Sequence, residues 1–345
     1  KEGGTTVEAE KKLKNVEFPF LLTAASKEGK EIGYLESVEL DAEIGEGKSD
    51  FELTLNMKNA DVLHYGCRIY VPETEFGGLA EKMKVSTKTN KITWSGETWR
   101  GLLVKKILEP PENEDHIILN GELNECIEQL VGDKFGSLFI VDRENTGVML
   151  KNHKVERFTN LYDAIMKFLG EKGYSLNITY KKPEGPENGA VWLKAEPITD
   201  YSNIEYSQDY DVDFDVTDNR RGINHLICAG EGQNQERIVL HLYVQKDGSI
   251  GKTPYYKGID ERAALYSFTS ADVTKLEEDG IKRLKELQNS KEVNVTVDNA
   301  DFELGDIIGG YEQITGTEVR KPIVRKILKM SNGKATIEYK VKGDD

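Results

Sequence analysis

The sequence has no cysteine-rich segment, no long apolar run and no excess of basic residues. Its three cysteines, Cys67, Cys126 and Cys228, lie far apart and form no CxxC pair, which argues against a disulfide framework or a zinc ribbon and predicts three reduced, buried thiols. No run of about 18 apolar residues is available to cross a bilayer, so we predict no membrane insertion. The formal net charge of −15 is spread along the chain. Because this charge repels polyphosphate, we predict no specific nucleic-acid binding.

Motifs that carry catalytic chemistry are also missing. The sequence contains no GxSxG or HExxH motif, and no cysteine stands in a papain-like context. The segment AGEGQNQE has neither P-loop nor GxGxxG spacing, so we interpret it as a turn. With 61 Asp and Glu residues, an acidic pair could be chosen anywhere and indicates no glycoside hydrolysis. We therefore predict no catalytic and no cofactor-binding residue.

Two segments resemble metal sites only superficially. QDYDVDFDVTDN has Asp at every second position, but an EF-hand counted from Asp211 has valine and glycine where glycine and glutamate are required. Alternation instead predicts a strand with a charged outer face. His225 and Cys228 in NHLIC alternate onto opposite faces of one strand, so together with His241 they form an incomplete ligand set. We predict no metal-binding residue.

The size and composition are those of a folded protein with several domains. At 345 residues, with 38% hydrophobic and 31% charged residues, the chain is long enough for two or three domains. Its first residues, KEGGTTVEAEKKLKN, include neither an initiator methionine nor the apolar segment of a signal peptide. We expect residues 1–15 to be a disordered or artificially added tail.

Alternating apolar and polar residues predict a first β domain over 16–110. YLESVELDAEIG and DFELTLNM are typical of half-buried antiparallel strands. HYGCRIYVPETEFGG is expected to be a strand that stops at Pro72 and turns at 77–78. KMKVSTKTNKITWSGETWRGLL is expected to be two strands joined by a turn at 88–90, with Trp94 in the core.

The Pro-rich acidic stretch EPPENEDH at 109–116 predicts a domain boundary, followed by a small α/β domain over 111–205. Its clearest helix is TNLYDAIMKFLGEKG, which Thr159 or Asn160 can cap and which ends near Gly173. The expected apolar face of this helix comprises Leu161, Ile165, Phe168 and Leu169. YSLNITY and AVWLKAEP are expected to follow as strands.

Strand patterns return in YDVDFDVTD, NHLICAGEG and RIVLHLYVQKDG. They predict a second β domain over 206–245 and 290–345, interrupted by a helical insertion over 246–289. The helix of the insertion, SADVTKLEEDGIKRLKELQNSK, has Ser270 as its expected N-cap and Gly280 as a weak point. Its expected apolar face comprises Val273, Leu276, Ile281, Leu284 and Leu287.

Residues 59–96 and 299–342 are similar to each other and predict an internal duplication. Both begin Asn-Ala-Asp, run into a strand broken by one glycine, Gly66 or Gly305, and then reach a Lys-rich strand and a final hairpin. Each glycine would serve a bend at a barrel corner, whereas the pair at 309–310 is interpreted as a loop. The alternative is chance similarity between two β-rich segments. The duplication predicts a mainly β fold with α+β insertions, in which two related β-barrel modules flank the small α/β domain.

Several stretches resemble, in order and spacing, the tail hub proteins of bacteriophage baseplates. They are KITWSGETWRGLL at 91–103, NLYDAIMKFLGEKGYSLNI at 160–178, ITDYSNIEYSQDYD followed by NRRGINHLICAGEG within 198–232, and DFELGDIIGGYE at 301–312. The resemblance covers residues 16–343. It is to the N-terminal part of the Tal-like family, the tail-associated, prophage tail endopeptidase-type proteins of long, non-contractile tails.

This resemblance implies a structural protein and not an enzyme. In such a hub, two β-barrel modules per subunit form a pseudo-sixfold ring in a homotrimer, which joins the tail tube or distal tail ring to the tip and closes or opens the DNA channel. The implied partners are a distal tail or tail tube protein, the tape-measure protein, and receptor-binding or cell-wall-degrading tip proteins. The implied location is the virion tail tip or baseplate, after synthesis in the bacterial host cytoplasm. No cofactor is implied.

Two other functions stay open at this point. A hub component of a contractile tail or injection device would share the fold and differ in its partners. A peptidoglycan-degrading tail enzyme, an endopeptidase or a glycosidase, is the second alternative. Larger relatives often carry a C-terminal enzymatic or receptor-binding domain; because this sequence ends in KVKGDD directly after its last predicted strand, we expect a short hub or one part of a longer one.

Overall fold

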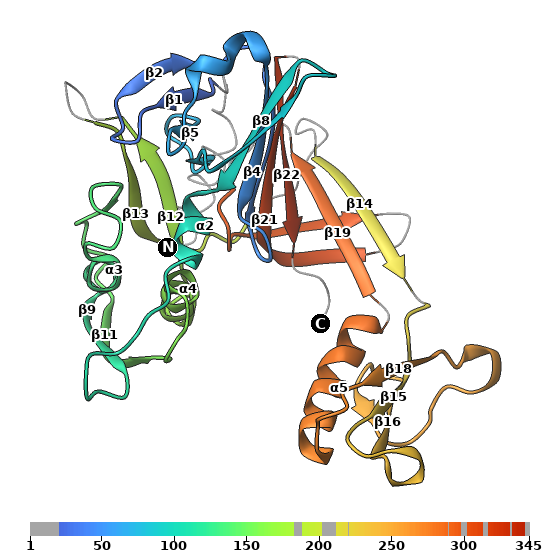
Figure 1. Cartoon of the computed structure of the whole chain (residues 1–345). Helices are drawn as coiled ribbons and strands as arrows, with labels where there is room; N and C mark the ends of the chain where they lie inside the picture. Colours follow the sequence, from blue (N-terminus) through green and yellow to red (C-terminus); the bar gives the residue numbers. More distant parts are fainter. Residues whose placement is uncertain are drawn as a thin grey trace. The chain divides into compact units, whose positions relative to one another are not determined.

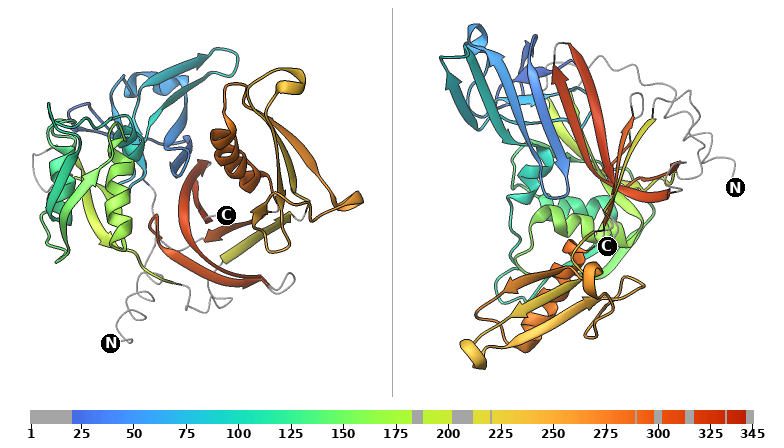
Figure 2. Two further views of the ribbon diagram at one scale, coloured as in Figure 1. Left: turned by 90° about the horizontal axis from the view of Figure 1, so that it is seen from below. Right: turned by 90° about the vertical axis from the view of Figure 1, so that its right-hand side faces the viewer.

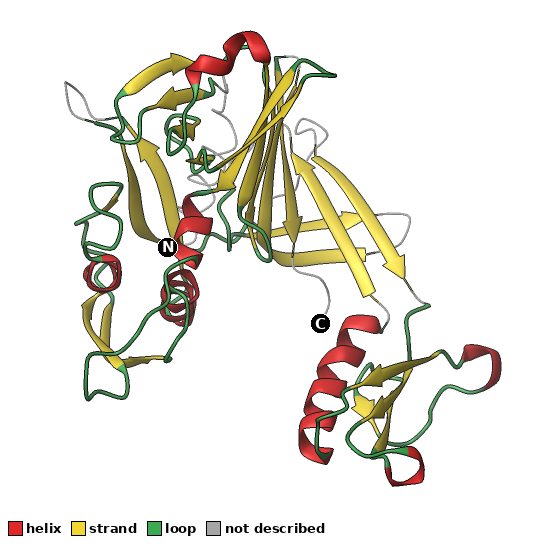
Figure 3. Cartoon of the chain, in the orientation of Figure 1, coloured by secondary structure: helices red, strands yellow, loops and turns green. Residues whose placement is uncertain are grey.

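The structure is a computed structural model, and it describes residues 21–182, 188–201, 212–219, 221–288, 290–297, 302–312, 317–331 and 333–341. The fold is mainly β with few helices (Figures 1 and 3). The chain divides into two compact units. Unit 1 comprises Lys1–Asp213 and Val295–Val341, and unit 2 comprises Phe214–Asn294 and Lys342–Asp345. The tail predicted at 1–15 lies outside the described residues.

The largest sheet, most of whose strands lie in unit 1, has the order β14-β19-β22-β21-β3-β4-β8-β7, with β20 paired to β21. Its strands are β3 (Glu39–Gly45), β4 (Asp50–Asn56), β7 (Lys82–Ser86), β8 (Lys91–Glu97), β14 (Val212–Asn219), β19 (Ser290–Val297), β20 (Ile307–Glu312), β21 (Thr317–Ser331) and β22 (Lys334–Val341). The strand β21 pairs with β3, so the C-terminal strands, in red, lie beside the N-terminal strands, in blue (Figure 2). The boundary between the units falls within β14 and β19.

The predicted strand alternation is confirmed at the centre of this sheet. Phe51, Leu53 and Leu55 of β4 are buried, and the residues between them face outward. Trp94 on β8 pairs with Leu53 and is 2% exposed, as its core assignment requires. The expected barrels are not seen: no sheet formed by the described strands closes on itself.

A second, smaller sheet of unit 1 has the order β2-β1-β5-β6. Its strands are β1 (Thr23–Ala25), β2 (Glu31–Tyr34), β5 (Arg68–Tyr70) and β6 (Gly77–Leu79), and the 3-10 helix η1 spans Met57–Val62. The prediction of a turn at 77–78 is wrong, because Gly77 and Gly78 begin β6. A Cβ on Gly78 would lie 2.3 Å from the Glu97 carbonyl oxygen, so these glycines allow close strand approach.

The α/β part of unit 1 places helices against a three-stranded sheet, β10-β13-β12, beside the hairpin of β9 and β11. Its elements are α2 (Trp99–Val104), β9 (Ile117–Glu122), α3 (Leu123–Val131), β10 (Phe139–Val141), β11 (Met149–Val155), α4 (Leu161–Glu171), β12 (Tyr174–Lys181) and β13 (Ala190–Pro197). The predicted apolar face of α4 is confirmed, and Asn160 is its cap, because its side chain accepts a hydrogen bond from the Asp163 amide. WRGLL, expected in a strand, forms α2 instead.

Unit 2 packs one helix on one face of a four-stranded sheet, β17-β16-β15-β18. Its elements are β15 (His225–Ala229), η2 (Asn234–Glu236), β16 (Val239–Val244), β17 (Ile250–Gly251), η3 (Gly258–Asp260), β18 (Ala263–Ser267) and α5 (Val273–Leu287). Asp272, and not Ser270, caps α5, because its side chain accepts from the Lys275 amide. Val273 was expected on the apolar face but is 53% exposed.

The two similar segments form the same turn. The amide of Gly66 donates to the Ala80 carbonyl, and the amide of Gly305 donates in the same way to the Ile323 carbonyl, at 2.8 Å in both cases. Both glycines have positive φ, 83° and 97°, which only glycine adopts without strain.

The residue after each glycine also has the same role in both turns. The amides of Cys67 and Asp306 donate to the carbonyls three residues earlier, at His64 and Glu303. Their own side chains accept from the amides of those residues.

A hairpin follows each turn, β7–β8 in the first segment and β21–β22 in the second, and the two hairpins flank β3 and β4 in one sheet. One detail of the duplication is corrected. Gly309 and Gly310, interpreted as a loop, lie within β20 and pair with Arg320 and Val319 of β21.

Candidate functional site

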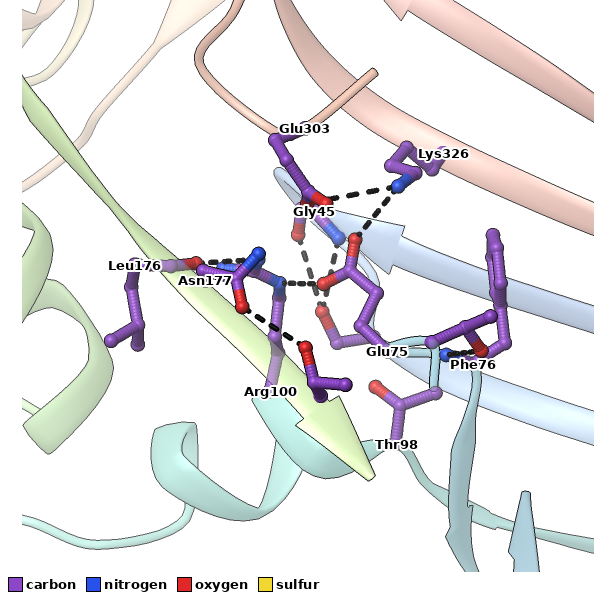
Figure 4. Close-up of polar contacts among 12 residues, drawn as sticks. Gly45, Glu75, Phe76, Thr98, Arg100, Leu176, Asn177, Glu303 and Lys326 are labelled. Atoms are coloured by element: carbon purple, nitrogen blue, oxygen red, sulfur yellow. Dashed lines mark hydrogen bonds and ion pairs between the residues drawn. The ribbon is translucent and has the colours of Figure 1, made fainter. Parts of the chain in front are cut away.

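Four charged side chains from distant parts of the sequence meet in the interior of unit 1, and we call them the ionic cluster: Glu75, Arg100, Glu303 and Lys326 (Figure 4). Glu75 lies between β5 and β6, and Arg100 lies in α2. Glu303 precedes β20, and Lys326 lies in β21. Glu75 therefore belongs to the first of the two similar segments, and Glu303 and Lys326 belong to the second.

The contacts of the cluster hold the Glu75 carboxylate from both sides. Arg100 Nε donates to Glu75 Oε2 at 2.7 Å, and Lys326 Nζ lies 3.3 Å from Glu75 Oε1. Lys326 Nζ also lies 3.8 Å from Glu303 Oε2. Arg100 reaches further, because its Nη2 donates to the Leu176 carbonyl of β12 at 2.8 Å. The cluster thus joins both similar segments and the α/β part of unit 1 (Figure 4).

The cluster is dry. Arg100 and Lys326 are each 1% exposed and Glu75 is 4% exposed. The amino group of Lys326 lies over the rings of Phe76 and Tyr339, 5.5 and 5.9 Å from their centroids, an arrangement that offsets part of the desolvation of its charge. Removal of charge from water is costly unless the charges compensate one another, and here two cations meet two carboxylates.

Electrostatics keep Glu75 and Arg100 ionised. Burial alone raises the pKa of Glu75, but the positive charges of Arg100 and Lys326 outweigh burial and hold the pKa below its ordinary value. Burial alone lowers the pKa of Arg100, but the Glu75 carboxylate outweighs it and holds the pKa above its ordinary value. At neutral pH Glu75 and Arg100 therefore form a fully charged pair.

The local structure around α2 directs the Arg100 side chain into the ionic cluster. Thr98 caps α2 by accepting a hydrogen bond from the Gly101 amide, and Trp99 is fully buried beside it. A Cβ on Gly101 would lie 2.3 Å from the Ser49 carbonyl oxygen. Glycine at this position lets α2 lie against the loop between β3 and β4, so that Arg100 points into the interior.

A groove of about 660 Å³ lies beside these elements. It is lined by the β3–β4 loop, by α2 and α4, and by the segments around Gly305 and Ile323. Tyr162 connects the groove to the cluster, because Arg100 Nη1 donates to its hydroxyl at 3.4 Å. Both oxygens of Glu75 face cations, so this carboxylate is not available as a general base.

A second polar group occupies unit 2. His225 Nδ1 lies 2.7 Å from Glu261 Oε1, and His225 Nε2 lies 2.8 Å from His241 Nδ1. The predicted separation of faces is confirmed, since Cys228 lies in the core against α5 and not with these histidines. No group of three His, Cys, Asp or Glu side chains with metal-binding geometry occurs among the described residues.

The three cysteines lie at buried positions. All three are free and buried, as predicted. Burial raises the pKa values of Cys126 and Cys228 to about 11, so both thiols stay protonated at neutral pH.

In the described part of the chain, no helix is long and apolar enough to span a membrane.

No residue of the ionic cluster stands out in the sequence. Arg100 stood in a stretch expected to be a strand, and Lys326 was one of several basic residues in a strand expected to be Lys-rich. The only signal was the glycine turn, since Glu303 and Asp306 belong to the turn at Gly305 whose duplication was predicted.

No protein-family model matches the sequence, and no curated protein matches it. Similar solved structures include the tail protein from Neisseria meningitidis, with 11% identity, 95% of this chain and 97% of that chain covered, and a TM-score of 0.46. The 43 kDa tail protein of prophage MuSo2 from Shewanella oneidensis has 12% identity, 93% and 98% coverage and a TM-score of 0.49. The prophage tail protein gp18 from Listeria monocytogenes has 15% identity, 93% and 94% coverage and a TM-score of 0.43. All three structures are described as tail proteins.

Proposed function

We propose that this chain is a structural tail hub of a phage or prophage, which forms a homotrimer with a pseudo-sixfold ring. The duplicated turn and hairpin carry this proposal. One chain with two equivalent modules offers two equivalent attachment surfaces, so three chains offer six. Such a ring joins a six-fold tube to a three-fold tip. The stretches that resemble Tal-like hub proteins at 91–103, 160–178 and 301–312 support the same function.

The ionic cluster supports a mechanical role. A ring that holds a tail tube needs its two modules fixed relative to each other within unit 1. Glu75 from the first segment and Lys326 from the second meet in the buried interior, where mutual attraction of charges is stronger than in water. The proposed partners are a distal tail or tail tube protein, the tape-measure protein and tip proteins for receptor binding or cell-wall degradation. In this proposal, the acidic chain offers passing DNA no attachment.

The mass in solution tests the proposal. We expect the full chain to sediment as a trimer, with three times the subunit mass of 38.9 kDa, at several concentrations. A monomer at every concentration would contradict it. An incubation with purified cell walls separates the hub from a tail enzyme, because a hub is expected to release no soluble peptidoglycan fragments.

A further inference from the structure

A cavity of about 720 Å³ lies in unit 1, and we call it the basic pocket. Its walls come from the smaller sheet of unit 1, from α2 and the residues that follow it, and from the segment between α3 and β10. Six charged residues of the described chain line it, and four of them are basic: Lys27, Arg68, Lys105 and Lys106. The chain as a whole has a formal net charge of −15, so this excess of positive charge is local.

Arg68 is the buried member of this set, with 3% of its surface exposed. Its guanidinium donates to the carbonyl oxygens of Lys27 and Gly189, and in the described part of the chain no carboxylate forms an ion pair with it. Carbonyl oxygens accept its hydrogen bonds but do not neutralise its charge. A buried charge is costly without a counter-charge, and its attraction for an anion is stronger there than in water.

Two lysines of the pocket also retain their charge for a ligand. Lys27 and Lys106 have no carboxylate partner among the described residues, whereas Lys105 forms an ion pair with Glu97 at 2.8 Å. The ammonium group of Lys106 lies 5.2 Å from the centroid of the Phe135 ring. This contact holds the ammonium group at the wall of the pocket without neutralising it.

The two acidic residues of the lining have other hydrogen-bond partners. Glu28 Oε2 accepts from the Ser26 hydroxyl at 2.9 Å, and this bond is the largest cause of the lowered pKa of Glu28. Glu81 Oε2 accepts from the Glu97 amide at 3.1 Å. The basic pocket is therefore suited to carboxylates that come from outside it.

Exposed carboxylates are concentrated in the turn between α2 and β9, residues 109–115, which we call the acidic turn. It carries four of them, on Glu109, Glu112, Glu114 and Asp115, and all four residues are exposed. Within the described structure, ion pairing in this turn is limited to Asp115, whose Oδ1 lies 3.9 Å from Arg157 Nη1. These carboxylates are thus available to a partner.

The acidic turn has a defined shape. The Glu114 amide donates to the Pro111 carbonyl at 3.0 Å, and Asn113 has a positive φ of 67°. Pro110 and Pro111 restrict the backbone further. A segment that is ordered before it binds loses less entropy on binding.

We propose that the acidic turn of one copy of this chain binds in the basic pocket of a second copy. Glu112 and Glu114 meet the two free lysines of the pocket, and the buried guanidinium adds its attraction. The proline rings lie against the apolar part of the lining, which is formed by Leu79, Leu102 and Leu138. The occupant is a second copy because the chain itself carries the complementary charge in an ordered, exposed form.

The turn and the pocket are different surfaces, so the contact is heterologous and closes a ring when it is repeated around an axis. This inference rests on the proposed function, because it supplies a contact between the subunits of the trimer.

A peptide tests the contact separately from the trimer. The probe is a fluorescently labelled peptide of residues 108–116, LEPPENEDH, and the control peptide has Gln and Asn in place of Glu and Asp. The receptor is the full chain with Glu112→Gln and Glu114→Gln, so that its own turns do not compete. In fluorescence anisotropy we expect the acidic peptide to bind about tenfold more tightly than the control, as a few exposed ion pairs allow. Adding Lys27→Glu with Lys106→Glu to the receptor should abolish this difference.

Charge reversal tests the same contact in the assembly. We expect Lys27→Glu with Lys106→Glu, and separately Glu112→Lys with Glu114→Lys, to lose the trimer in sedimentation experiments with the full chain. The quadruple variant exchanges the charges of the two surfaces and is expected to recover the trimer. That recovery separates a specific contact from general damage to folding.

A matched control changes lysines elsewhere. Lys282→Glu with Lys285→Glu reverses two exposed lysines of α5 and is expected to leave both the trimer and peptide binding intact. If the wild type is a trimer but the two peptides bind equally, a double variant of the turn or pocket stays trimeric, or the quadruple variant fails to recover, the inference is overturned while the hub proposal stands. A wild-type protein that is monomeric at every concentration overturns the trimer itself, and this contact between copies with it.

Discussion

At the scale of single residues, the charges of the ionic cluster add little net stability to the fold, but each one makes the presence of its partner necessary. When two opposite charges are buried together, their attraction does little more than offset the free energy lost on removing them from water. Removal of one partner, however, leaves the other charge buried and uncompensated. Glu75 contacts both cations of the cluster, so loss of its charge removes a partner from each of them.

We predict that Glu75→Gln lowers the free energy of unfolding by about 3–5 kcal/mol, the usual effect of breaking a buried ion pair. Urea denaturation followed by circular dichroism at pH 7 measures this change. The matched control is Glu156→Gln, which breaks the exposed pair with Lys167 and is expected to change stability little. Equal effects of the two variants would contradict a special role for the buried cluster.

The stability difference between the wild type and Glu75→Gln is expected to depend on pH. The folded-state pKa of Glu75 is lowered, so its contribution is fully present above the unfolded-state pKa of about 4.3 and is lost as the pH falls through the folded-state pKa. The stability difference between wild type and Glu75→Gln should therefore shrink with falling pH, beginning near pH 4.3. A difference that grows on acidification would reverse the assigned direction of the pKa shift.

At the scale of elements, helix α5 depends on a glycine for its packing. A Cβ at Gly280 would lie 2.7 Å from Cys228 Sγ and 2.9 Å from Leu242 Cδ1. These atoms belong to the core of unit 2, so they have little room to move. The sequence marks Gly280 as a weak point in a helix, whereas the structure shows that it permits close contact between α5 and the sheet.

We predict that Gly280→Ala destabilises the protein by about 1–3 kcal/mol, as overpacking of a core does. Gly170 in α4 is the matched control, because a Cβ there would meet nothing within 4 Å. Gly170→Ala should be stabilising by up to about 1 kcal/mol, since alanine has the higher helix propensity. Thermal denaturation of both variants measures the two effects, and a stabilising Gly280→Ala would show that the sheet yields to the added methyl group.

The elements predicted correctly are those whose pattern is local. The helix α4 has a 3.6-residue apolar period and its own cap, and β4 alternates cleanly. The helix α2 has six residues, too short for a period, and tertiary packing of Trp99 decides its form. The cap of α5 was misplaced by two residues, because Ser270 and Asp272 are both good caps and only the geometry of the chain selects one.

The ionic cluster could not be predicted for a related reason. Alternation assigns a residue to a face but does not say which distant segment lies against it. In β21 the alternation itself fails, because the pairing with β22 shifts between Ile323 and Arg325. After this bulge Lys326, Ile327 and Leu328 are all buried, so a lysine enters the interior of a strand that reads as basic and exposed.

At the scale of the whole molecule, the duplication is the feature that the sequence and the structure share most directly. The glycines at 66 and 305 were found by sequence similarity, and their hydrogen bonds prove equivalent. Glycine is needed at both positions for its positive φ, which explains why this part of the pattern survives while the surrounding residues differ. In each copy the hairpin pairs with the central β3–β4 pair, which separates the two copies in the sheet.

Because the chain divides into two units, we predict that a mutation in one unit lowers the stability of that unit alone. Unit 2 has its own hydrophobic core, formed by its sheet and α5, while Glu75 lies in unit 1. Mutations that share no partner usually add in free energy. We therefore expect Glu75→Gln to reduce amide hydrogen-exchange protection in unit 1, including α2 and β21, and Gly280→Ala to reduce it in unit 2, including β15, β16 and α5. The double variant should show both losses and no others. If Gly280→Ala also reduced protection in β21, the two units would unfold as one cooperative body, and the stability of the proposed ring could not be adjusted separately from that of unit 2.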